Sequence, residues 1–169
     1  GMGEPLANYA STLKAIKILT SDYGAAFSNR KVTVSTCGLV PEIISLGKDI
    51  CINLAVSLNA ADDATRGKLM PINRKYTLAK LLEACRKYPM PGRRLLTFEY
   101  ILMDGINSSV KDAEKLAAWM LAFVSGKWGA LMVAPLLPVG IETPAIRYFA
   151  GFAVVFLVVL IGVLLGPHT

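Results

Sequence analysis

Three short apolar segments alternate with amphipathic segments in the N-terminal part of this chain, and this alternation constrains the fold more than any other feature. The apolar segments are KVTVSTCG (31–38), INLAVSLNA (52–60) and RLLTFEYILMDG (94–105). These segments contain many β-branched or aromatic residues, which is typical of strands. Because their apolar runs are nearly continuous, we expect strands that are covered on both faces and that form a parallel sheet.

Four other segments have apolar residues at helical spacing. We expect helices over residues 8–20, 41–46, 77–88 and 110–123. Strands and helices therefore alternate, which predicts βαβ units of the α/β fold class. Short crossovers between such units place consecutive strands side by side in the sheet.

Polar residues follow the predicted strands, at the positions where α/β proteins bind their ligands. Ser35 lies at the end of the first strand, and Ser57 and Asn59 lie at the end of the second. The stretch GMGEP (1–5) precedes a helix, so it is interpreted as a further strand-end loop; taken alone, it is more simply a turn with a solvated carboxylate. We expect these loops to meet at one edge of the sheet.

Charge and cysteine content narrow the classes of function. The net charge of +6 is compatible with a nucleic-acid partner but supports one only weakly. Cys37, Cys51 and Cys85 are widely spaced and form no CxxC or CxxxCxxC motif, which excludes a complete local metal or cluster site. So few cysteines fit a reducing compartment, and we expect all three to be small apolar core residues.

The composition changes near residue 126. Residues 148–166 contain no charged side chain, and a helix of this length is long enough to span a bilayer. The chain is therefore divided into a soluble α/β part (1–126), an apolar linker (127–147) and a candidate transmembrane helix (148–166).

Several longer motifs, taken together, resemble one family. They are GMGEPLANY, RKVTVSTCGLVPEI, NLAVSLNAADDATRGKLMPINRKY, LLEACRKYP and RRLLTFEYILMDGIN. In content and order they resemble the radical-SAM 23S rRNA (adenine-C2) methyltransferases, the RlmN/Cfr family. The resemblance extends to about residue 122 and implies a partial (β/α) radical-SAM barrel.

The resemblance also implies cofactors, partners and a location. Members of the family use S-adenosylmethionine and a [4Fe–4S] cluster to methylate C2 of an adenine in 23S rRNA, and many also modify tRNA. An electron donor such as flavodoxin and a cytoplasmic location are expected. The choice between C2 and the related C8 specificity stays open.

The binding residues implied by the resemblance lie in the strand-end loops. Gly3 and Glu4 are expected to hold the methionine end of S-adenosylmethionine, with Glu4 accepting a hydrogen bond from its ammonium group. The next implied binding residue is Ser35, at the end of the first predicted strand. The remaining implied residues are Ser57, Leu58 and Asn59, although many relatives have His in place of this Asn.

Two further sets of polar residues are open to two interpretations each. Glu99 is expected to point into the barrel, either as a structural hydrogen-bond partner or as a ligand of the cofactor. Asn73, Arg74 and Lys75 form either a solvated loop or a contact with RNA phosphates.

Three parts of the family pattern have no counterpart in this sequence. The CxxxCxxC cluster motif is expected before GMGEP, a further strand with an Asn ligand is expected after Phe123, and the methyl-carrying cysteine is absent. We therefore expect no metal ligands and no catalytic cysteine, and we expect the chain as written to be inactive.

Alternatives remain open for the function and for the tail. One alternative to a methyltransferase is a non-catalytic, membrane-anchored protein that retains part of an α/β nucleotide-binding fold. Another is a member of a different radical-SAM branch, but the motifs STCG and PINRKY match the methyltransferases and argue against it. The tail is either a genuine transmembrane helix or the product of a shifted frame or a misjoined assembly. We favour the second origin because the family is soluble and cytoplasmic.

Overall fold

The computed structural model describes residues 3–91 and 94–125, which form two compact units. The first unit contains Gly1–Asn59 and Arg66–Ile101, and the second contains Ala60–Thr65 and the chain from Leu102 onward. The first unit holds the sheet and all the candidate site residues. The second is built around one helix.

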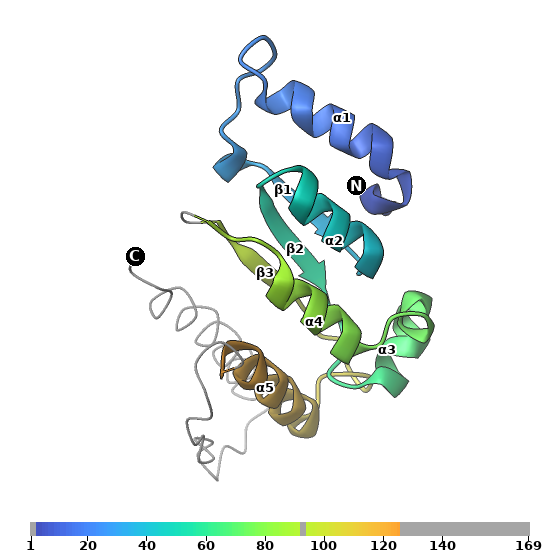
Figure 1. Cartoon of the computed structure of the whole chain (residues 1–169). Coiled ribbons are helices and arrows are strands. Elements are labelled where there is room, and N and C mark those ends of the chain that lie inside the picture. Colours follow the sequence, from blue (N-terminus) through green and yellow to red (C-terminus); the bar gives the residue numbers. More distant parts are fainter. Residues whose placement is uncertain (1–2, 92–93, 126–169) are drawn as a thin grey trace. The chain divides into compact units, whose positions relative to one another are not determined.

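A three-stranded parallel sheet forms the centre of the first unit (Figure 1). Its strands are β1 (Thr33–Thr36), β2 (Asn53–Ser57) and β3 (Leu96–Glu99), in the order β1-β2-β3. The predicted strands, their parallel direction and their side-by-side order are therefore confirmed. Each strand is shorter than predicted, because the regular pairing stops before the apolar run does; after β3, for example, residues 100–103 lie outside the strand.

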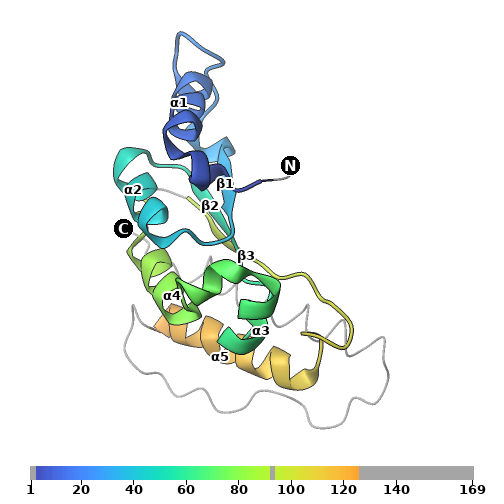
Figure 2. The ribbon, with the colours of Figure 1, turned by 90° about the vertical axis from the view of Figure 1, so that its right-hand side faces the viewer.

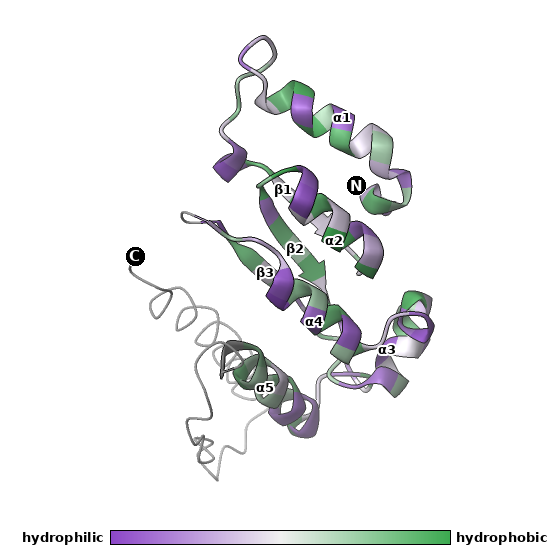
Figure 3. Cartoon of the chain, viewed as in Figure 1, coloured by the Kyte–Doolittle hydropathy of each residue, from purple (hydrophilic) through white to green (hydrophobic). Residues whose placement is uncertain are grey.

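Helices α2 (Val40–Asp49) and α4 (Leu78–Lys87) pack side by side and lie on the same side of the strands (Figures 1 and 2). Both helices are amphipathic, and α4 shows hydrophobic and hydrophilic segments in Figure 3. The fully buried side chains on the two helices include Ile43, Leu46 and Leu81. Together with the buried residues of β2, they form the core of the first unit.

The two faces of the sheet differ in polarity. Along β1 and β3 the residues alternate between a more exposed and a more buried position, whereas β2 is buried over most of its length. The outward residues of the two outer strands are Thr33, Ser35, Thr97 and Glu99. The prediction that every strand is covered on both faces is therefore wrong for β1 and β3, because their outward side chains are polar and stay hydrated.

The remaining helices of the first unit precede or connect these elements. Helix α1 (Tyr9–Thr20) follows a 3-10 helix at Pro5–Asn8 and confirms the helix expected there. Helix α3 (Asp63–Leu69) and the 3-10 helix at Pro71–Arg74 were not predicted. Both are short, and their sequence is too polar to give a clear apolar periodicity.

The second unit is organised around α5 (Val110–Ser125), which confirms the last predicted helix. Ser109 and Asp112 cap its first turn reciprocally, since the Ser109 hydroxyl accepts from the Asp112 N–H and the Asp112 carboxylate accepts from the Ser109 N–H. Lys115 Nζ lies 2.6 Å from Asp62 Oδ2, and Trp119 Nε1 donates to the Ala61 carbonyl. These contacts attach α5 to the segment Ala60–Thr65.

Within residues 3–91 and 94–125, no helix combines the length and the apolar character needed to cross a membrane. The expected linker (127–147) and the candidate transmembrane helix (148–166) lie outside the described residues. The boundary at residue 126 therefore stays a prediction.

Replacing Ile43 by Ala should destabilise the first unit, because Ile43 is 0% exposed and its neighbour Ile44 is 42% exposed. We expect Ile43→Ala to lower the free energy of unfolding by about 2–5 kcal/mol, and Ile44→Ala by less than about 1 kcal/mol. Urea unfolding of the 169-residue chain measures both values. Equal losses for the two variants would contradict the assignment of this α2 face to the core.

The ion pair in the second unit should make stability depend on pH in the acid range. Lys115 and the Thr65 N–H lower the pKa of Asp62 to about 2. Ionised Asp62 therefore stabilises the fold at pH values above the unfolded-state pKa of about 3.9. This contribution to the free energy of unfolding is lost as the pH falls towards 2.

Asp62→Asn should therefore be less stable than the parent at pH 7, by about 1 kcal/mol for this partly exposed pair, and the difference should vanish near pH 2. Urea unfolding between pH 7 and pH 2 gives this difference, with the exposed Asp22→Asn as the matched control. A difference that stays constant over this range would refute the role of the ion pair.

Candidate functional site

Side chains from all three strands converge at the carboxyl end of the sheet. The Ser35 hydroxyl of β1 donates to Glu99 Oε2 of β3 at 2.9 Å, and the Ser57 hydroxyl of β2 donates to the same oxygen at 3.0 Å. All three side chains lie on the polar face, which the core helices leave open. The structure thus brings two predicted binding residues together around a carboxylate.

The strand register explains how one carboxylate reaches both hydroxyl groups. Ser57 is paired directly with Glu99, whereas Ser35 is paired with Ala55, two residues before Ser57 on β2. Ala55 is only 5% exposed although it lies on the open face, as expected if the Glu99 side chain crosses over it. A small residue at this position leaves room for the crossing.

The Gly-Glu-Pro loop is attached to the end of β1 through the Glu4 carboxylate. Glu4 Oε1 accepts from the Leu6 N–H at 3.1 Å and starts the following 3-10 helix, and Glu4 Oε2 accepts from the Cys37 N–H at 2.6 Å. Gly3 has a φ of 120°, a region that favours glycine, and open space lies where a side chain would stand. The expectation that this loop meets the end of a strand is confirmed.

Leu58 and Asn59 follow β2 and link the neighbouring loops, mainly through their backbone groups and the Asn59 side-chain amide. The Leu58 side chain is buried, its N–H donates to the Glu99 carbonyl and its own carbonyl accepts from Arg66. Asn59 has a φ of 55°, and its Oδ1 accepts from the Ile101 N–H. The two residues therefore join the loop after β2 to the loop after β3.

Arg66 is fully buried and holds the ends of β1 and β2 in place. Its guanidinium donates to the carbonyls of Cys37, Ser57 and Leu58 at 2.8–3.0 Å and to Asn73 Oδ1 at 2.9 Å. Arg66 was not singled out as a candidate, because its surroundings, DDATRGK, are typical of a solvated surface. Only the fold shows that this charge lies inside.

The structure revises the interpretation of the segment PINRKY. Asn73 is 3% exposed and binds Arg66, so its assignment to a solvated loop is wrong. Arg74 and Lys75 are exposed. A contact of these two cations with RNA stays a prediction.

Cys37 and Cys85 are poorly suited to act as nucleophiles. Burial and the Glu4 carboxylate raise the pKa of the Cys37 thiol to about 12, and burial raises that of Cys85 to about 12, so both stay protonated at neutral pH. Only Cys85 is fully buried, while Cys37 and Cys51 are half-buried. Among the described residues, no group of three Cys, His, Asp or Glu side chains is placed to hold a metal ion.

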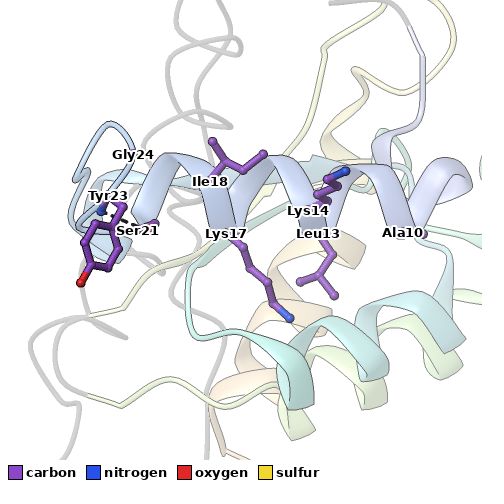
Figure 4. Close-up of a pocket in the computed structure, with 8 residues that line it drawn as sticks. All are labelled: Ala10, Leu13, Lys14, Lys17, Ile18, Ser21, Tyr23 and Gly24. Carbon is purple, nitrogen blue, oxygen red and sulfur yellow. Dashed lines mark hydrogen bonds between the residues drawn. The ribbon is translucent and has the colours of Figure 1, made fainter.

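A separate open depression runs along the exposed side of α1 (Figure 4). Its lining is partly apolar and partly basic, with Leu13, Ile18, Lys14 and Lys17 from the helix and Tyr23 from the loop that follows. Among the described residues that line it there is no carboxylate, and the Ser21 hydroxyl accepts from the Tyr23 N–H. The strand-end cluster is therefore the better candidate for a site that binds a polar ligand.

Comparisons with known proteins place the chain among the radical SAM enzymes. The model of the Radical SAM superfamily matches residues 1–118. The dual-specificity RNA methyltransferase RlmN of Syntrophus aciditrophicus is 68% identical over 116 residues, which are 69% of this chain and 33% of that protein. RlmN of Geobacter sulfurreducens is 55% identical over 116 residues, which are 69% of this chain and 32% of that protein.

A solved structure supports the same relationship. The crystal structure of a radical SAM methyltransferase from Sphaerobacter thermophilus has a TM-score of 0.73 and 36% identity, and the match covers 94% of this chain and 47% of that one. The chain spans about a third of the length of the curated relatives that it matches. The resemblance to the RNA methyltransferases and the partial radical-SAM α/β fold are thus confirmed.

Removing the buried guanidinium of Arg66 should lower the free energy of unfolding. Arg66→Met leaves three backbone carbonyls and Asn73 Oδ1 without this donor, so we expect a loss of at least about 3 kcal/mol in the free energy of unfolding. The matched control is Arg74→Met, at an exposed position of the same segment, with an expected change within about 0.5 kcal/mol. Urea unfolding measures both, and similar stabilities of the two variants would disprove the structural role of Arg66.

Proposed function

Because the chain belongs to the radical SAM superfamily, we propose that it is part of an RNA methyltransferase that methylates C2 of an adenine in 23S rRNA and in tRNA. The observation that carries this proposal is the 68% identity to a dual-specificity RNA methyltransferase over 116 residues. The superfamily model, which matches residues 1–118, covers every candidate binding residue. Cytoplasmic location, RNA as the partner and an electron donor such as flavodoxin are part of the same proposal.

Intact enzymes of this superfamily use S-adenosylmethionine and a [4Fe–4S] cluster. The described residues do not fit the cluster, since no three potential ligands lie together among them. They do fit S-adenosylmethionine, whose ammonium and hydroxyl groups need the acceptors that the open face offers. When bound, S-adenosylmethionine supplies the methyl group and the radical chemistry that an unreactive aromatic carbon requires.

The residues of this chain would bind and orient this cofactor. Glu4 keeps the Gly-Glu-Pro loop against the end of β1, and each of its carboxylate oxygens retains a lone pair for an ammonium group. Ser35 and Ser57 present their oxygens on the open face. The absence of a side chain at Gly3 allows close approach, and Leu58 and Asn59 define the loop beside Ser57.

Exposed cations near the strand ends suit the nucleic-acid partner. Arg74 and Lys75 lie at the end of the 3-10 helix whose Asn73 is fixed by Arg66, so their backbone position is well defined. We propose that these two side chains meet phosphate groups of the RNA.

A chimera tests the activity. The 116-residue segment of this chain that matches the S. aciditrophicus protein replaces its counterpart there, and the cluster is reconstituted without oxygen. We expect transfer of a radiolabelled methyl group from S-adenosylmethionine to 23S rRNA, with 2-methyladenosine in the digest. The 169-residue chain alone should transfer none, because its sequence lacks the CxxxCxxC motif.

The unmodified S. aciditrophicus protein serves as the positive control. A chimera that folds and holds its cluster but leaves the RNA unlabelled would refute the proposed function. Methyl transfer by the 169-residue chain alone would refute its proposed inactivity.

A further inference from the structure

We propose that Glu99 is a positioning residue that fixes the direction of the hydrogen bonds offered by Ser35 and Ser57 to the cofactor. The inference rests on the proposed function, because it assumes that the open face binds S-adenosylmethionine. It goes further by assigning a role to a residue outside the set of binding positions implied by the resemblance. The convergence of both hydroxyl groups on one carboxylate oxygen carries it.

The hydroxyl protons of Ser35 and Ser57 are both engaged by Glu99. A serine hydroxyl has one proton to donate and two lone pairs to accept with, whereas a carboxylate only accepts. At 2.9 Å and 3.0 Å from Glu99 Oε2, both hydroxyl groups donate their single proton to that oxygen. Ser35 and Ser57 then present only lone pairs to any molecule on the open face.

The oxygens of Ser35 and Ser57 restrict which ligand atoms can approach them. Atoms that contact these two oxygens must themselves be donors, which the ammonium group and the ribose hydroxyl groups of S-adenosylmethionine are. The carboxylate of its methionine moiety has no proton to offer and is excluded from this position. Glu99 therefore selects the orientation of the ligand without needing to touch it.

The fold itself does not require the Glu99 carboxylate. Glu99 is exposed and lies on the polar face, away from the core between the sheet and helices α2 and α4. The backbone pairing of β2 with β1 and β3 already sets the register. The extra link from β3 across Ala55 to β1 serves the arrangement of the two hydroxyl groups.

A double-mutant cycle in the chimera described above tests the role of Glu99. Four proteins are compared: the parent chimera, Glu99→Gln, the pair Ser35→Ala and Ser57→Ala, and all three changes together. Equilibrium dialysis with S-adenosylmethionine gives the Kd of each, so the readout is binding and not turnover. Glu99→Gln keeps the size of the side chain but introduces an amide donor that competes for the hydroxyl oxygens.

We expect Glu99→Gln to raise the Kd about tenfold when both serines are present and to change it less than about twofold when both are Ala. Equal effects in the two backgrounds would mean that Glu99 contacts the ligand directly and would overturn the inference. An unchanged Kd in the parent background would also overturn it. A parent chimera that does not bind S-adenosylmethionine would instead refute the proposed function itself.

Two controls keep the result interpretable. Glu83→Gln makes the same chemical change at an exposed position of α4, where Glu83 pairs with Lys87, and should leave the Kd unchanged. Glu99→Ala removes the carboxylate without adding a donor and frees both hydroxyl protons; we expect it to weaken binding less than Glu99→Gln does. A stronger loss for Glu99→Ala than for Glu99→Gln would contradict the proposed competition for the hydroxyl oxygens.

Discussion

The guanidinium of Arg66 binds three backbone carbonyls at the carboxyl ends of β1 and β2 from inside the protein. A buried charge is tolerated only where its donors are satisfied, so these carbonyls and Asn73 must stay in place around it. The bonds fix the backbone at Cys37, Ser57 and Leu58, from which the candidate binding loops begin. The geometry of the whole strand-end region therefore depends on one side chain.

The same sheet serves two purposes because its faces differ. The residues of one face pack against α2 and α4 and supply the core, and the polar residues of the other face stay open. Glu99 links the hydroxyl groups of the two other strands on this open face. Stability and ligand binding are thus separated by the side-chain alternation of β1 and β3.

Much of the fold could be predicted from the sequence, because apolar periodicity reports local structure. The three strands, their order and four of the helices follow from it, and the polar strand ends pointed to Ser35 and Ser57. The burial of Arg66 could not be predicted, since it depends on the Cys37 carbonyl, which is 29 residues away along the chain. The burial of Asn73 follows from its bond to Arg66. The link from Glu99 to Ser35 could not be predicted either, because it depends on the register of three strands and on a small residue at position 55.

If the proposed function is correct, the open polar face of the sheet is the cofactor site. The measurement that tests it most directly is a crystal structure, with S-adenosylmethionine bound, of the chimera that carries this segment. We expect the ligand over the open face, with a donor group of the ligand within hydrogen-bond distance of Ser57 Oγ and the Glu99 bridge intact. A ligand bound elsewhere, or one whose carboxylate faces the two serines, would contradict the account.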